Sequence, residues 1–251
     1  MSEVSIKKHS YFKSCLIVFL VFCVFALWFF LIFIPKARDE ARAMVCTNNC
    51  KQLELIFYNY HSVYGCYPPA YTVDENGKPL HSWRVLVLPF MYQQHLYSEI
   101  RLDEPWDSEY NRQFHDRMPS QFACPSCRSL EPETSKTNYL RIVGPGTLTN
   151  GPDTVSREQI DQPESTILLV ESTRSVCWMT PEDLTLDDLK LGVICQPEKG
   201  QNVGISSLHR KQAHVVLCDD SVHHSVLQIS PDTPSQLLEA AARVRLKPKS
   251  K

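Results

Sequence analysis

Glycine is scarce in this chain, whose 251 residues include 8 glycines and 17 prolines. No P-loop and no G-x-G-x-x-G pattern occurs, so the sequence predicts no phosphate-binding loop. No G-x-S-x-G turn occurs either, which argues against an α/β-hydrolase nucleophile. The excess of proline indicates ordered turns and extended connections rather than flexible linkers. These absences leave no cofactor to predict.

The chain also lacks an excess of charge of either sign. Charged residues make up 22% of the sequence and the formal net charge is −2, which gives no basis for binding nucleic acid or another polyanion. There are no internal repeats and no low-complexity segments. Residues 36–251 are therefore expected to form a folded domain with its own hydrophobic core.

Polar residues are absent from one long segment near the N-terminus. Every residue from Cys15 to Ile34 is apolar, in the order CLIVFLVFCVFALWFFLIFI. At about 1.5 Å per residue, a helix of this length spans about 30 Å, the thickness of the hydrocarbon core of a bilayer. The run exceeds the apolar part of a signal peptide, and no small-x-small cleavage site follows it. We therefore expect residues 15–34 to be a retained transmembrane helix in contact with membrane lipid.

The flanking basic residues do not set the orientation of this helix. They are balanced, with Lys7, Lys8 and Lys13 before the span and Lys36, Arg38 and Arg42 after it. The cysteines are more informative, because all but Cys15 and Cys23 lie outside the span as an even, dispersed set, typical of a compartment where disulfides form. We therefore expect a single-pass protein of the cytoplasmic membrane, with residues 1–14 in the cytoplasm and residues 35–251 outside it.

Beyond the span, the pattern predicts a second helical part and then strands. Pro35 predicts a kink, after which apolar residues recur at helical spacing, including Met44 or Val45, Leu53, Ile56, Tyr60 and Val63. Gly65 and Pro68-Pro69 end that helix. Residues 82–100 are expected to be helical despite Pro89. Short β-branched runs predict four strands, at 137–144, 165–172, 213–218 and 222–229, and the third and fourth strands are expected to form a hairpin. Residues 236–246 are expected to form a final helix.

Several runs resemble a prepilin-like family of unknown function that is abundant in planctomycete bacteria. Members of that family carry a pilin-type N-terminal helix and end in a His-x9-Asp-Gly box. The runs are ARDEARAMVCTNNCKQLELIFYNYHSVYGCYPPAY, NGKPLHSWRVLVLPFMYQQHLY, LDEPWDS, FACPS, TNYLRIVGPGT and WMTPEDL. His209 stands ten residues before Asp219, in the position of the terminal box. The resemblance extends from residue 35 to about residue 245.

The resemblance implies a type IV pilin-like α+β fold. In such a fold the transmembrane helix continues into a helix that packs on an antiparallel β-sheet, with additional short helices. The resemblance also places cysteines at the positions of Cys46 and Cys124, which makes these two residues the preferred disulfide pair. Cys46 and Cys50 share one helix face at i, i+4 spacing, so a metal or two separate partners remain alternatives for them.

The chain departs from the prepilin pattern where that pattern is processed. Counting back from Pro35 places Lys13 at the expected glycine, Ser14 at the first mature position and Val18 at the expected glutamate. Asp220 also replaces the glycine of the terminal box, in a turn where glycine would adopt a positive φ more easily. We therefore expect a permanently anchored relative that a prepilin peptidase does not cleave, rather than a pilus subunit.

Two sets of residues have the spacing of a metal or redox site. Cys124 and Cys127 form a C-x-x-C, but no second pair completes a zinc site and no βαβ setting surrounds it. A structural disulfide is therefore the favoured interpretation of these cysteines.

A histidine cluster is the second set. His209, His214, His223 and His224 fall close together, and His214 with His223 or His224 and an acidic partner, Asp219 or Asp220, would be the candidate metal ligands. The simpler interpretation is a pair of half-exposed strands, since tandem histidines point to opposite faces. No nucleophile motif accompanies Ser207, His209 and Asp219, so a hydrolase is not predicted. No metal site is predicted overall.

These observations favour a structural or interaction role over an enzyme. The expected partners are membrane lipid and secretion or pilus-like assembly proteins. A first alternative is an extracytoplasmic ligand-binding module that uses aromatic residues near Pro68-Pro69, although such residues more often form a core. A second alternative is a metal-dependent enzyme that uses the region from His209 to His224.

The departures at residues 13–18 predict that the N-terminus is not processed at Ser14. N-terminal sequencing and intact-mass measurement of the chain purified from membranes should detect no form that begins at Ser14. Recovery of such a form would contradict this prediction and would favour processing by a prepilin peptidase.

Overall fold

The computed structural model describes residues 2–130, 134–198, 200–201, 203–209, 212–218 and 226–243, with side chains described for these residues except 2–15 and 128–130. The chain divides into two units, Met1–Arg42 and Ala43–Lys251. Each unit is described here by itself.

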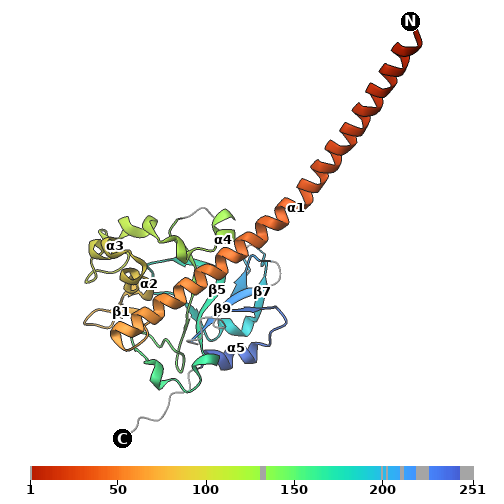
Figure 1. Ribbon diagram of the computed structural model, residues 1–251. Helices are drawn as coiled ribbons and strands as arrows, with labels where there is room; N and C mark the ends of the chain where they lie inside the picture. Colours follow the sequence, from red (N-terminus) through yellow and green to blue (C-terminus); the bar gives the residue numbers. More distant parts are fainter. Residues whose placement is uncertain are drawn as a thin grey trace. The chain divides into compact units, whose positions relative to one another are not determined.

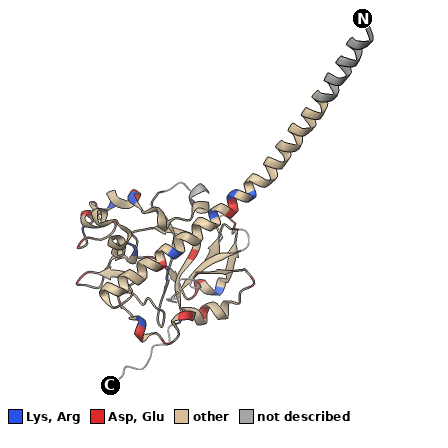
Figure 2. Ribbon diagram, in the orientation of Figure 1, with Lys and Arg blue, Asp and Glu red and all other residues tan. Residues whose placement is uncertain are grey.

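The first unit is the apolar part of helix α1, which runs from Ser2 to Tyr64 (Figure 1). The helix continues through Pro35 without interruption, and the kink there remains a prediction. Large apolar side chains from Leu16 to Ile34 are exposed, and no charged residue occurs among them (Figure 2). The helix is long and apolar enough to cross a membrane, a property that fits either a membrane span or a signal sequence.

In the second unit, the remainder of α1 packs on the domain through one stripe of side chains. Cys46, Cys50, Leu53, Phe57 and Tyr60 are buried at spacings of three and four residues. The sequence placed Leu53 and Tyr60 on this stripe correctly. Val63 is instead exposed, as are both Met44 and Val45, which were alternatives for one position. Near Met44 and Val45 the buried positions are occupied by Cys46 and Cys50.

A four-stranded sheet lies against this stripe. Its strand order is β10-β9-β5-β3 and every neighbouring pair is antiparallel. The strands are β3 (Lys136–Leu140), β5 (Ile167–Cys177), β9 (Ala213–Leu217) and β10 (Val226–Ile229). Val226 pairs with Val216, so the predicted pairing of the last two strands is confirmed, while the expected turn at 219–221 lies outside the described residues. The predicted α+β arrangement of a long helix on an antiparallel sheet is therefore confirmed.

The sheet buries apolar side chains on both faces. Tyr139, Leu169 and Val216 join the core under α1. Leu140, Val170 and Val215 join a second core that includes Leu238 of α5 (Ser235–Ala242). Because successive strand residues alternate between faces, residues two positions from Leu169 and Val216 also face α1. Glu171 and His214 occupy those positions, and His214 contacts Thr47 of α1.

The region between α1 and β3 contains short elements. Residues 82–100 divide into α2 (Trp83–Leu86), η1 (Leu88–Met91) and α3 (Gln94–Glu99). The single helix expected there is wrong, because Pro89 sits near the start of η1 and Tyr92 ends that element in the left-handed conformation at φ 58°. The remaining elements are β1 (Tyr71–Val73), β2 (Pro79–Ser82), η2 (Asn111–Arg117), η3 (Ser120–Phe122), α4 (Pro125–Leu130), β4 (Ile142–Val143), η4 (Arg157–Gln159), η5 (Pro163–Ser165), β6 (Leu184–Thr185), η6 (Asp188–Leu191), β7 (Val193–Cys195) and β8 (Ile205–Ser207).

A buried ion pair joins α2 to the segment before β6. Arg84 lies 2.5 Å from Asp183 Oδ1, and both side chains are almost wholly buried. Arg84 also donates to the Tyr139 carbonyl at 3.0 Å. The Arg141 amide and the Trp83 indole donate to the Asp183 carboxylate at 2.9 and 3.2 Å. Burial raises the pKa of Asp183 and lowers the pKa of Arg84, while the attraction between the two charges opposes both shifts.

Removing one member of this pair should destabilise the domain. Asp183→Asn leaves the Arg84 guanidinium buried without a counter-charge, which is expected to reduce the free energy of unfolding by about 3–5 kcal/mol. The matched control is Glu182→Gln, which removes a partner of Arg174 at a site that is half exposed and should change stability by no more than about 0.5 kcal/mol. Chemical denaturation in detergent measures both, and equal losses would contradict a special role for the buried pair.

Candidate functional site

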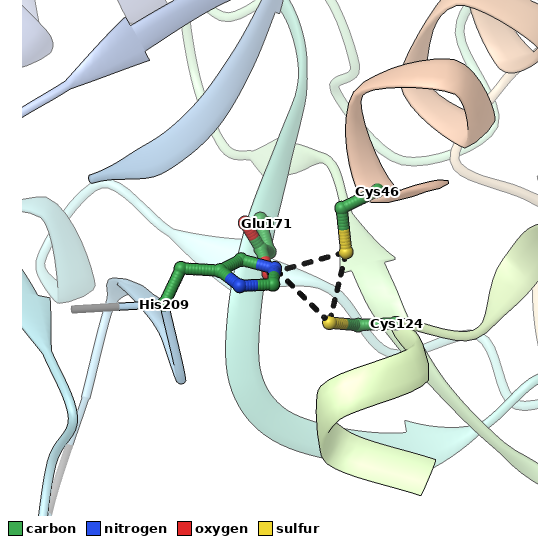
Figure 3. Close-up of side chains that lie close together, drawn as sticks. All are labelled: Cys46, Cys124, Glu171 and His209. Atoms are coloured by element: carbon green, nitrogen blue, oxygen red, sulfur yellow. Dashed lines mark hydrogen bonds and ion pairs between the residues drawn. The ribbon is translucent and has the colours of Figure 1, made fainter. Parts of the chain in front are cut away.

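Four side chains with metal-ligating atoms converge beneath α1. They are Cys46, Cys124, Glu171 and His209, and all four are buried. Their ligand atoms lie within 4.8 Å of one another, and the four side chains point toward a common centre (Figure 3). We call these four residues the Cys-His-Glu cluster.

The members of the cluster come from four separate segments. Cys46 lies on the buried stripe of α1, and Cys124 directly precedes α4. Glu171 lies within β5, and His209 follows β8 by two residues. The fold, and not the local sequence, therefore assembles the cluster.

The distances within the cluster are short. The sulfurs of Cys46 and Cys124 are 2.9 Å apart. The Cys46 sulfur is 3.8 Å from Glu171 Oε1, and the Cys124 sulfur is 3.7 Å from His209 Nε2. His209 Nε2 lies 3.8 Å from Glu171 Oε1. A disulfide bond is about 2.05 Å long, so these sulfurs are in contact but not bonded, and the predicted Cys46–Cys124 disulfide remains a prediction.

The two cysteines of the cluster hold protons unequally. Hydrogen bonds with Cys127 and with Cys46 lower the pKa of the Cys124 thiol. The hydrogen bond to Cys124, burial and the charge of Glu171 raise the pKa of Cys46. Burial raises the pKa of Glu171, an effect that the hydrogen bond with His214 opposes.

A second set of contacts holds the Glu171 carboxylate. Its Oε2 lies 2.7 Å from His214 Nδ1 and accepts from the His214 amide at 3.3 Å. The other ring nitrogen of His214 lies 2.9 Å from the Thr47 hydroxyl of α1. The Ser207 hydroxyl donates to Glu171 Oε1 at 3.0 Å and accepts from the His209 amide at 3.1 Å. These contacts orient Oε1 toward the two sulfurs.

The comparison with protein-family models gives a match. The family model described as "Protein of unknown function (DUF1559)" matches residues 35–184, more than half of the chain. The chain belongs to the DUF1559 family. No curated protein and no solved structure matches it significantly. The DUF1559 match contains Cys46, Cys124 and Glu171 and ends before His209.

The structure of this DUF1559 chain describes only some of the candidate residues from the sequence. His214 uses both ring nitrogens in contacts with Glu171 and Thr47, so it supports the cluster rather than completing it. His223, His224, Asp219 and Asp220 lie outside the described residues. The metal group suggested around His214 is therefore not assembled within the described part of the chain, where His209 joins the two cysteines instead.

The other sequence candidates also have defined partners. Ser207 is hydrogen-bonded to Glu171 and His209, so its hydroxyl is held by structural contacts. Cys127, the second cysteine of the C-x-x-C, hydrogen-bonds with Cys124 and only adjoins the cluster. The residue that sequence analysis missed is Glu171. Its signal was a carboxylate inside the apolar run ILLVES of β5, which burial makes costly unless the carboxylate has partners.

Most of the large aromatic residues of the DUF1559 domain form its core. Trp83, Trp178 and Tyr67 are buried, whereas Tyr58 and Tyr64 of α1 are exposed. The expectation that these aromatics mainly form core is therefore confirmed for the first three.

A pocket of about 510 Å³ lies along α1 within the second unit. Its lining includes Leu55, Tyr58, Tyr67, Arg157, Leu168 and Leu217. Apolar side chains from the helix and the sheet therefore meet at an accessible surface.

Proposed function

We propose that this DUF1559 chain is a membrane-anchored, pilin-like envelope protein with a structural or interaction role and no enzymatic activity. The observation that carries the proposal is the exposed apolar surface from Leu16 to Ile34, on a helix that continues unbroken to Tyr64. Such a surface is costly in water and is stable within a bilayer. Residues 35–251 would then lie outside the cytoplasm.

The pilin-like part of the proposal rests on architecture and sequence together. A long N-terminal helix packs its C-terminal part on an antiparallel sheet, as in the prepilin-like group that the sequence resembles. His209 and Asp219 would correspond to the terminal box of that planctomycete-type group. The residues at 13, 14 and 18 depart from the prepilin pattern, which supports a permanent anchor over assembly into a pilus.

A charge placed in the apolar segment should weaken anchoring. Phe22→Arg is expected to oppose membrane insertion by about 2.5–3.5 kcal/mol, whereas the matched control Phe22→Leu should be neutral. Carbonate extraction and protease treatment of spheroplasts measure insertion and orientation. The native chain and the control should remain in the membrane pellet with the domain digested from outside. Release of the native chain into the soluble fraction, or removal of the first 34 residues, would contradict the anchor.

An interaction role predicts specific partners in the membrane. Affinity purification of the full chain after crosslinking should recover secretion-type or pilus-like assembly proteins. Their consistent absence, with the anchor intact, would contradict this part of the proposal while leaving the anchor in place.

The pocket along α1 favours a second candidate, an extracytoplasmic ligand-binding module. Its lining combines apolar side chains, including Leu55, Tyr58 and Leu168, with the charged Lys51 and Arg157, which suits a small, largely apolar ligand that carries a polar group. The same purified material discriminates between the two candidates. Native mass spectrometry would detect a bound small molecule and no assembly proteins if ligand binding is the function.

A further inference from the structure

The Cys-His-Glu cluster has the dimensions of a tetrahedral metal site. Zinc lies about 2.3 Å from thiolate sulfur and about 2.0–2.2 Å from imidazole nitrogen or carboxylate oxygen, so the edges of its coordination tetrahedron are about 3.3–3.8 Å long. The separations between Cys46 and Glu171, Cys124 and His209, and His209 and Glu171 are 3.8, 3.7 and 3.8 Å. Three of the six edges therefore lie at or within about 0.5 Å of the length that a tetrahedral zinc ion requires, and all ligand atoms lie within 4.8 Å of one another.

The separation between the two sulfurs lies between the values expected for a disulfide and for a metal site. The sulfurs of Cys46 and Cys124 are 2.9 Å apart, which exceeds a disulfide bond of about 2.05 Å. The same separation is shorter than the edge of about 3.8 Å between two zinc-bound thiolates. The sulfur distance alone therefore does not decide between a metal and a disulfide. The positions of His209 and Glu171 favour a metal, because a disulfide needs neither an imidazole nor a carboxylate beside it.

The donor atoms select the class of ion. Two thiolates and one imidazole suit zinc and other thiophilic transition metals, whereas magnesium and calcium prefer sets of oxygen ligands. Two cysteines and the carboxylate of Glu171 can supply negative charge to a divalent ion. Because cysteine binds metal as a thiolate, binding would release the thiol protons to solvent.

The contacts around Glu171 and His209 resemble the outer contacts that orient metal ligands. His214 holds Glu171 Oε2 and leaves Oε1 directed at the cluster. Ser207 contacts both Glu171 Oε1 and the His209 amide. Hydrogen-bonded carboxylates and fixed imidazoles are typical of metal centres. The four ligands are buried, so the site would be closed and structural, without an open position for a substrate.

We propose that Cys46, Cys124, His209 and Glu171 bind one zinc ion that fastens α1 to the sheet. The ion joins the helix, the segment before α4, strand β5 and the segment after β8 at one point. This inference is independent of the proposed function, because it concerns the interior of the second unit alone.

Metal content of the full chain tests the proposal. The chain purified in detergent without added chelator should contain one zinc ion per molecule by plasma mass spectrometry. Cys46→Ser and His209→Ala should each reduce that content at least about tenfold, as expected for the loss of one ligand. Cys66→Ser is the matched control, because Cys66 is a partly buried cysteine outside the cluster, and it should retain the zinc. Equal zinc content in all variants would overturn the proposal.

A second measurement covers variants that fail to fold. Replacement of zinc by cobalt(II) in the native chain should give a thiolate charge-transfer band and the visible bands of a tetrahedral ion. Alkylation after denaturation with a chelator should find Cys46 and Cys124 as free thiols. A zinc-free native chain with a Cys46–Cys124 disulfide peptide would overturn the metal site and support the disulfide instead.

Discussion

The packing of one stripe of α1 on the sheet is the constraint on which the rest of the second unit depends. Cys46, Leu53, Phe57 and Tyr60 are buried on this stripe, and their apolar area provides the driving force for helix docking. The stripe also sets the register of the helix. A shift of one turn, about 5.4 Å, would move Cys46 out of reach of Cys124, so the same packing that forms the core also forms the cluster.

The sequence predicted the parts of the fold that local patterns determine. Strand β9, the described part of β10 and their antiparallel pairing follow from β-branched runs. The break near Pro89 was not predicted, because the apolar run there suggested one continuous helix. Pro89 and the left-handed conformation of Tyr92 interrupt that helix. The helix face was predicted only in part. Cysteine is among the most buried residue types, yet Cys46 and Cys50 were considered as reactive groups before they were considered as core.

The candidate site was less predictable, because its members are joined by tertiary structure alone. Cys46 and Cys124 were singled out by resemblance and His209 by the terminal box, but no spacing linked them to one another. Glu171 had no motif at all. Its role follows from physical necessity, since a carboxylate in the middle of a buried strand must find hydrogen-bond donors or a cation. His214 and Ser207 are the donors that the structure provides.

The two buried carboxylates among the described residues, Asp183 and Glu171, solve this requirement differently. Asp183 is neutralised by Arg84 at 2.5 Å, so its charge is balanced entirely by protein. Glu171 faces two cysteine sulfurs and two histidines, none of which carries a permanent positive charge as arginine does. A divalent ion at the cluster would balance Glu171 together with the thiolates.

The surrounding cysteines make a disulfide at the cluster ambiguous. Cys124 contacts both Cys46 and Cys127, and Cys50 lies buried one turn from Cys46. Oxidation could therefore form more than one disulfide, and an incorrect disulfide would distort the packing of α1 on the sheet. Metal coordination removes that ambiguity, because only Cys46 and Cys124 share the histidine and the carboxylate needed to complete a tetrahedron.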